Sequence, residues 1–283
     1  MGKVRIIADS TCDLSKELID RYGITVIPLY IQLDEKSYKD GIEITPPELY
    51  KWSDQTGRTP KTAAPGIDVV TEALRPFQEA DDEVIFFGIS EDMSTTCNVV
   101  RLVAADMEYR KVHVIDSMSL STGIGLQVLR AAEMAEEGID AEEIVTRIEA
   151  DRCKVRASFV IDTLVYLARG GRCSAMTALL AGALKLKPRI SVIDGKMDVT
   201  KKYRGNIAAA IKKYVADMEE DLKAADPKRV FITHSGCTPE VVQQVREQLE
   251  NLHHFEEIDE TIAGSVISSH CGPNTLGVLF YEK

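Results

Sequence analysis

The chain has 283 residues, of which 45% are hydrophobic and 28% charged, so it can build two domains, or one large one, around an extensive core. Its formal net charge of −11 argues against nucleic acid or an anionic membrane surface as a bulk partner. It contains no run of about 18 apolar residues, so no integral membrane segment is expected.

The N-terminus and the cysteines bear on the compartment. The first nine residues pass directly into an apolar stretch and lack the pattern of a signal peptide. The six cysteines are scattered and form no Cys-x-x-Cys pair, which predicts reduced thiols. The isolated spacings of His234 with Cys237 and of His270 with Cys271 do not make a zinc site. We expect a cytoplasmic protein without a metal or cofactor, and a monomer.

The first half of the chain alternates apolar strands with helices. Strands are predicted at residues 4–8 and 24–33, and two more begin at Val84 and Lys111. Pro28 favours an irregular or edge position for the second strand. Helices are predicted at residues 15–22 (capped by Ser10 or Thr11), from Thr45 onward, and at 67–78, 99–107, 119–138 and 139–153. This order predicts a parallel α/β sheet with right-handed crossovers.

Serine-bearing turns follow three of these strands, at Asp9-Ser10, at Ser90 and at Asp116-Ser117. In a parallel sheet, ligands lie beyond the carboxyl ends of the strands, so the three turns are expected to gather at one edge. Hydroxyl groups and helix N-terminal N–H groups aimed at one spot suit an anion, including a carboxylate. The simpler alternative is that Ser90 or Ser94 only caps the following helix.

The second half of the chain mixes a hairpin pattern with strands and helices. Strands are predicted at residues 157–161, 229–234 and 255–262, and at the C-terminus, with a hairpin around Asp194-Gly195. Helices are predicted from Thr163 and at residues 175–186, 203–223 and 239–251, and a glycine-rich turn carries His270. We expect an N-terminal α/β domain at residues 1–152, a Rossmann-like α/β/α sandwich, and a two-layer α+β domain at residues 153–283.

Two chemical interpretations of single residues stay open at this point. Ser94 and His270, with an aspartate such as Asp116, could form a serine hydrolase, although no Gly-x-Ser-x-Gly elbow is present. When each residue is considered alone, the simpler interpretation is a structural role for His270. Arg172 is then a charge near the end of a helix, and Thr62 is a turn residue.

The ordered set of motifs resembles the DegV family, and the resemblance runs over essentially the whole chain. The matching pieces are Asp9-Ser10-Thr11-Cys12-Asp13-Leu14, Lys61-Thr62-Ala63-Ala64-Pro65, Gly88-Ile89-Ser90, Ser94 with Thr96, Val114-Ile115-Asp116-Ser117, Tyr166-Leu167-Ala168-Arg169-Gly170-Gly171-Arg172 and Ser269-His270-Cys271-Gly272-Pro273.

The resemblance implies a two-domain protein of the EDD fold that binds one long-chain fatty acid, such as palmitate, between its domains. It implies no catalysis of its own: a separate fatty acid kinase would convert the presented carboxylate into an acyl phosphate. Thr62 and Ser94 match the family residues that hydrogen-bond the carboxylate. His270 matches the histidine near the head group, Arg172 matches the arginine of Gly-Gly-Arg, and Thr95 adjoins Ser94.

The chain departs from the family pattern at three of these places. Thr95 stands where the family usually has glycine, Cys97 where it often has tyrosine, and Ala63 where it has serine. The apolar helix predicted at residues 175–186 could line a tunnel for the acyl chain, or equally pack in a core. The rival from another class is a small hydrolase of lipid or acyl esters that uses Ser94 and His270.

Overall fold

The computed structural model describes residues 2–173 and 186–283. Its N-terminal sheet has four parallel strands in the order β2-β1-β6-β7. They are β2 (Thr25–Ile27), β1 (Val4–Asp9), β6 (Glu83–Gly88) and β7 (Val112–Asp116).

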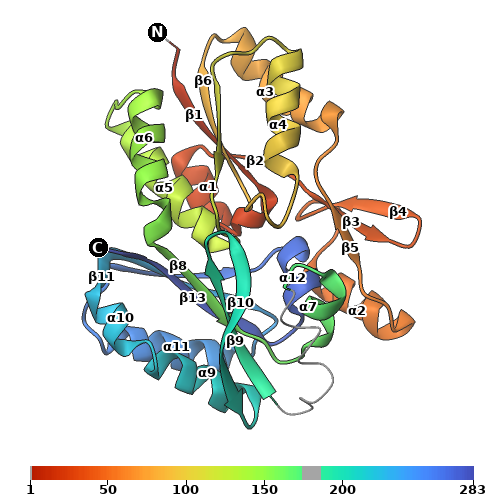
Figure 1. Cartoon of the computed structure of the whole chain (residues 1–283), viewed down its shortest axis with the longest axis vertical. Helices are drawn as coiled ribbons and strands as arrows, with labels where there is room; N and C mark the ends of the chain where they lie inside the picture. Colours follow the sequence, from red (N-terminus) through yellow and green to blue (C-terminus); the bar gives the residue numbers. More distant parts are fainter. Residues whose placement is uncertain (1, 174–185) are drawn as a thin grey trace.

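Helices cover both faces of this sheet, because both faces of its strands are apolar (Figure 1). Ile6 and Phe87 pack on the side of α1, α5 and α6, whereas Ile7 and Phe86 pack on the side of α3 and α4. The helices are α1 (Lys16–Tyr22), α3 (Ile67–Glu79), α4 (Thr96–Asp106), α5 (Thr122–Glu136) and α6 (Ala141–Asp151). The expected α/β/α sandwich is confirmed.

A small antiparallel sheet, in the order β4-β3-β5, extends from this domain toward the C-terminal domain (Figure 1). Its strands are β3 (Tyr30–Leu33), β4 (Lys36–Lys39) and β5 (Lys61–Ala63), and the helix α2 (Pro46–Thr56) lies between β4 and β5 in the chain. A capping box of Thr45 and Glu48 begins α2, in which Pro46 takes the first position.

The C-terminal domain is a six-stranded mixed sheet in the order β10-β9-β8-β13-β11-β12. Its helices α9, α10 and α11 cover the face turned away from the N-terminal domain (Figure 1), which confirms a two-layer α+β arrangement. The strands are β8 (Val155–Val160), β9 (Leu186–Ile193), β10 (Lys196–Arg204), β11 (Ala225–Ser235), β12 (Glu257–Ile262) and β13 (Thr275–Glu282). The helices are α7 (Val165–Gly170), α9 (Ile207–Ala216), α10 (Glu219–Ala224), α11 (Pro239–Glu250) and α12 (Ser265–Cys271).

Several expected elements have different bounds. The strand expected at residues 24–33 is divided into β2 and β3, which belong to different sheets, and Pro28 lies between them. Ser15, not Ser10 or Thr11, caps α1, by accepting a hydrogen bond from the Leu18 N–H group at 3.3 Å.

In the C-terminal half, the helix expected at residues 203–223 begins later and is broken: β10 runs to Arg204, and α9 and α10 follow. The expected glycine-rich turn around His270 is the helix α12. The helix expected at residues 175–186 lies outside the described residues except for Leu186, which begins β9. Across residues 2–173 and 186–283, no helix is long and apolar enough to cross a bilayer.

Three buried carboxylates lie where the two domains meet, around the start of α12. Asp13 accepts a hydrogen bond from the Gly264 N–H group at 2.8 Å, and Asp40 accepts one from the Ser265 N–H group at 2.7 Å. Asp9 accepts one from the Ile89 N–H group at 2.8 Å, which ties the end of β1 to the end of β6. No lysine or arginine pairs with these three acids in the described part of the chain.

Burial without a cation governs the ionisation of these acids. Desolvation raises the pKa of Asp9 to about 6, despite its hydrogen bonds with Thr11 and Ile89. It also raises the pKa of Asp13 well above its usual range, and that of Asp40. The fold therefore holds these carboxyl groups most easily in their protonated form.

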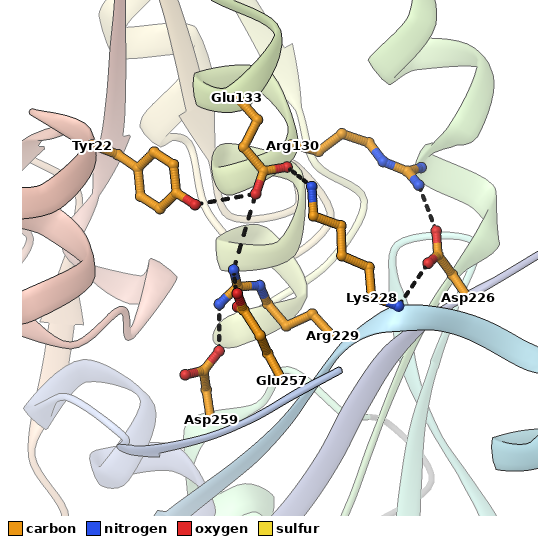
Figure 2. Close-up of polar contacts among 8 residues, drawn as sticks. All are labelled: Tyr22, Arg130, Glu133, Asp226, Lys228, Arg229, Glu257 and Asp259. Carbon is orange, nitrogen blue, oxygen red and sulfur yellow. Dashed lines mark hydrogen bonds and ion pairs between the residues drawn. The ribbon is translucent and has the colours of Figure 1, made fainter. Parts of the chain in front are cut away.

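On another part of the domain boundary, an ion-pair network surrounds Arg229 of β11 (Figure 2). Its side chain is only 5% exposed and pairs with Glu257 and Asp259, while Glu133 of α5 lies 4.0 Å away. Glu133 also pairs with Lys228 and accepts a hydrogen bond from the Tyr22 hydroxyl at 3.1 Å. The network thus joins α1 and α5 of the N-terminal domain to β11 and β12.

Replacing Arg229 is expected to destabilise the protein strongly. Arg229→Met leaves several carboxylates facing one another without their cation, so the free energy of unfolding should fall by about 3 kcal/mol. Arg156→Met is the control, because Arg156 and Glu282 form an ion pair in which both side chains are 45% exposed, worth less than about 1 kcal/mol. Urea denaturation measures both variants, and equal losses would contradict a special role for Arg229.

Asp9 should make stability fall as the pH rises. A carboxyl pKa raised from 3.8 to about 6 leaves the fold fully stabilised below pH 3.8 and costs about 3 kcal/mol by pH 7, at about 1.4 kcal/mol for each pH unit. Relative to Asp9→Asn, the native protein should therefore lose up to that amount between pH 4 and pH 7 in urea titrations. Relative to Asp82→Asn, the native protein should instead gain stability as the pH rises, because the hydrogen bond from Arg5 lowers the pKa of Asp82. Parallel curves for the native protein and Asp9→Asn would refute this account.

Candidate ligand-binding site

A cavity of about 570 Å³ lies between the two domains, within the range of about 300–1,000 Å³ that is typical of small-molecule sites. Its walls come from the ends of β6 and β7, from β5, from α12, and from the face of the six-stranded sheet that is turned toward the N-terminal domain. Representative residues of these walls are Ile89, Leu120, Thr62, His270 and Phe159.

All five residues predicted for the site line this cavity. Thr62 comes from β5, and Ser94 and Thr95 from the turn between β6 and α4. Arg172 follows α7, and His270 lies in the last turn of α12. The fold thus gathers polar groups from four separate segments at one end of the cavity.

Thr62 and His270 are in direct contact. The Thr62 Oγ1 atom lies 2.9 Å from the His270 Nε2 atom. Pairing of Thr62 with Ile31 across β5 and β3 fixes the threonine, while the hydrogen bonds of Asp13 and Asp40 fix the start of the helix that carries the histidine. The two side chains therefore meet because the small sheet packs against α12.

His270 is neutral at physiological pH. Burial, together with the positive charge of Arg172, lowers the pKa of its imidazole to about 4. Its Nδ1 atom is buried and has no hydrogen-bond partner in the described part of the chain. Since a buried N–H donor is rarely left unpaired, we assign the proton to Nε2. Nε2 then donates to Thr62, and the Thr62 hydroxyl proton is free to donate into the cavity.

The turn that carries Ser94 and Thr95 opens α4. Thr95, rather than Ser90 or Ser94, occupies the N-cap position of α4, and its side chain makes no capping hydrogen bond. The Ser94 hydroxyl lies 2.8 Å from the Thr96 hydroxyl and accepts a hydrogen bond from the Thr96 N–H group at 3.3 Å. The positive end of the α4 dipole therefore lies beside these hydroxyl groups, as suits an anion.

Arg172 brings a positive charge to the same end. Its guanidinium group donates to the Gly170 carbonyl at 2.7 Å and to the Met93 carbonyl at 3.4 Å. It is exposed, and it is the single arginine or lysine among the described residues that line the cavity. The guanidinium thus ties the end of α7 to the turn that carries Ser94.

Two contacts that position the site, those of Gly170 and Ser90, were not predicted from the sequence. A Cβ atom on Gly170 would lie 2.2 Å from the His270 Nδ1 atom, so glycine is required for α7 to approach the histidine. The buried Ser90 hydroxyl donates to the Gly195 carbonyl at 2.7 Å and so holds the β9–β10 hairpin against the Ser94 turn. The Gly-Gly pair was a signal for the first, but no local signal points to the second, because its partner is 105 residues away.

The three departures from the family pattern have different positions. Thr95 and Ala63 line the cavity, so these two departures alter the side chains near its polar end. Cys97 is fully buried in the core between α4 and the parallel sheet, with its Sγ atom 3.6 Å from the Ile115 carbonyl oxygen.

A hydrolase triad is not assembled. His270 contacts Thr62, whereas the Ser94 hydroxyl contacts Thr96. Asp116 accepts hydrogen bonds from the Met118 and Glu91 N–H groups, so it does not orient the histidine. Within the described residues, no group of three or more acidic, histidine or cysteine side chains is arranged to hold a metal ion.

The rest of the cavity wall is mainly apolar. It includes side chains from the ends of the parallel strands, from α7 and α12, and from the six-stranded sheet: Leu29, Ile89, Met93, Leu120, Phe159, Leu167, Met197, Val266, Ile267 and Leu279. The arrangement, with hydrogen-bond donors and a cation gathered at one end and a mainly apolar remainder, suits an amphiphile that has a small anionic head.

Comparison with known proteins agrees with this geometry. Residues 3–283 match the family model described as "Uncharacterised protein, DegV family COG1307". The DegV domain-containing protein TTE1491 of Caldanaerobacter subterraneus is 34% identical over 286 residues, covering 100% of both chains.

Solved structures give the same result. A fatty-acid-binding DegV family protein from Thermus thermophilus superposes with a TM-score of 0.91 at 30% identity, over 99% of this chain and 100% of that one. DegV of Bacillus subtilis, a fatty acid binding protein, superposes with a TM-score of 0.87 at 26% identity over 100% of both chains. A stearic acid-binding protein from Eubacterium ventriosum gives a TM-score of 0.82 at 27% identity, over 100% and 99%. The chain belongs to the DegV family.

Proposed function

We propose that this protein binds one long-chain fatty acid in the cavity between its domains and presents the carboxylate to a fatty acid kinase. The observation that carries the proposal is the collection of Thr62, Ser94, Thr95, Arg172 and His270 at one end of an otherwise mainly apolar cavity. The structures of fatty-acid-binding relatives that share this fold support the same ligand class.

The apolar wall provides most of the affinity. Burial of about 14 methylene groups, at roughly 0.8 kcal/mol each, contributes about 11 kcal/mol before the costs of association. The hydroxyl groups of Thr62 and Ser94 orient the head group by donating to its oxygens, and Arg172 provides the compensating charge. None of these residues has to perform chemistry.

Exposure of the polar end supports presentation to a second protein. Thr95 and Arg172 are exposed, as are the neighbouring Glu91 and Asp92, whereas most of the sheet residues that line the cavity are buried. A carboxylate bound there lies near the surface, where a kinase can transfer the γ-phosphoryl group of ATP to a carboxylate oxygen and release ADP. We place this activity in the cytoplasm, where ATP is available, with the protein acting as a monomer.

The hydrolase alternative has less support. A histidine whose pKa is about 4 is a poor general base near neutral pH, and no carboxylate of the described residues bonds its Nδ1 atom to orient it as a base. We therefore propose a binding protein that is not itself an enzyme.

The double substitution Thr62→Ala with Ser94→Ala tests the head-group assignment. It should weaken fatty acid binding by about 1–3 kcal/mol, because the carboxylate loses two hydrogen-bond donors. Titration calorimetry with palmitic acid measures the change, and Thr146→Ala on the exposed face of α6 is the control. Unchanged affinity in the double variant would reject the assignment.

Native mass spectrometry and solvent extraction test the ligand class directly. We expect the added mass of one fatty acid of about 14–18 carbons, the length that a cavity of this size accommodates. A protein that stays unloaded after incubation with fatty acids would contradict the proposal. Steady hydrolysis of an acyl ester that is lost in Ser94→Ala would favour the hydrolase instead.

Presentation to a kinase needs its own assay. A purified bacterial fatty acid kinase with ATP and palmitic acid should form acyl phosphate, trapped as a hydroxamate, only when this protein is added. The double variant should lower the rate at subsaturating palmitate, in line with its weaker binding. Tight palmitate binding without any stimulation of the kinase would retain the binding function and refute the presenting one.

A further inference from the structure

The floor of the cavity is divided into an apolar half and a hydroxyl half. In the register of the six-stranded sheet, one row crosses five strands through Ile190, Phe159, Gly277, Thr233 and Thr261. Register partners place their side chains on the same face. Phe159, Gly277 and Thr233 all line the cavity, and glycine adds no side chain between the other two. A ligand that lies over Gly277 therefore meets an aromatic ring on one side and a hydroxyl group on the other.

Thr233 is the middle member of a chain of three buried hydroxyl groups. Its Oγ1 atom lies 2.6 Å from that of Thr122 and 3.0 Å from that of Thr261. Thr122 begins α5, so the chain connects the two domains. Among the described residues, the three hydroxyl groups make no hydrogen bonds other than these two.

A count of protons leaves one donor without a partner. Three hydroxyl groups carry three protons, and the two contacts use two of them. Thr122 and Thr261 are buried and do not line the cavity, whereas Thr233 does. The remaining proton therefore reaches an acceptor only when both neighbours donate to Thr233 and Thr233 directs its own proton into the cavity.

We propose that the cavity favours acyl chains that carry an oxygen atom along their length, as hydroxy and oxo fatty acids do, with the Thr233 hydroxyl donating to that oxygen. This specificity rests on the proposed binding of a fatty acid. A plain methylene chain over Thr233 displaces water and leaves the donor unpaired, whereas an oxygen on the chain satisfies it.

The test compares octadecanoic acid with 10- and 12-hydroxyoctadecanoic acid in titrations of the native protein and of Thr233→Val. For at least one hydroxy acid, the ratio of its affinity to that of octadecanoic acid should fall about tenfold in Thr233→Val, the effect of one lost hydrogen bond. Retained binding of octadecanoic acid shows that the variant is folded.

Thr275→Val is the matched control, because Thr275 also lines the cavity but its hydroxyl donates to the Cys271 carbonyl at 3.0 Å. In Thr275→Val, the ratio of hydroxy acid affinity to octadecanoic acid affinity is expected to equal that of the native protein, even if the variant binds both acids more weakly. An equal ratio in the native protein and Thr233→Val, or a native protein that binds octadecanoic acid but neither hydroxy acid, overturns the specificity and leaves the proposed function intact. If the native protein binds none of the three acids, the proposed function itself fails and the specificity fails with it.

Discussion

The hydrogen bonds from the Gly264 and Ser265 N–H groups to Asp13 and Asp40 fix the beginning of α12, and the geometry of the cavity depends on that helix. α12 carries His270 and contributes apolar side chains to the wall, so a shift of its axis would displace both the polar and the apolar parts of the site. Two buried carboxylates are an unusual way to hold a short helix, because the fold has to tolerate their desolvation. In return, they satisfy two N–H groups that the first turn of any helix leaves unpaired.

The domains are held together by interactions of very different kinds. Beside the cavity, the contacts are hydrogen bonds between neutral groups, such as Ser90 with Gly195 and Thr122 with Thr233, together with those that Asp13 and Asp40 accept from the start of α12. At the network around Arg229, they are ion pairs that include a buried guanidinium (Figure 2). Breaking a neutral hydrogen bond costs less than exposing or orphaning a buried charge.

The arrangement of the N-terminal sheet was predictable, because each apolar strand and the polar turn after it are local patterns, as at Val84–Ser90. The ordered motifs pointed to five residues that line one cavity, but the contacts of these residues were not predictable. The pair of Thr62 with His270 joins residues 208 positions apart, and the tie of Ser90 to Gly195 joins residues 105 apart. The helical state of the segment around His270 was missed because its serines and the following glycine resemble a turn, whereas Asp13 and Asp40 stabilise the helix from distant parts of the chain. Tertiary contacts also divide the strand expected at residues 24–33 between two sheets.

The distribution of charge favours one orientation of the proposed fatty acid in the cavity. Hydroxyl groups line the cavity at Thr62 and Ser94 and also at Thr233, so hydrogen bonding alone does not decide where a carboxylate binds. An ionised carboxylate at Thr233 would be buried beside the neutral hydroxyl groups of Thr122 and Thr261. The one arginine or lysine among the described lining residues, Arg172, is instead bonded to Gly170 and Met93. A buried carboxylate without a cation costs several kcal/mol. At Thr62 the carboxylate has Arg172, the N-terminus of α4 and access to water, each of which favours the charged form. In the proposed function, the charged oxygen therefore belongs beside Arg172, and the oxygen proposed to meet Thr233 has to be a neutral one.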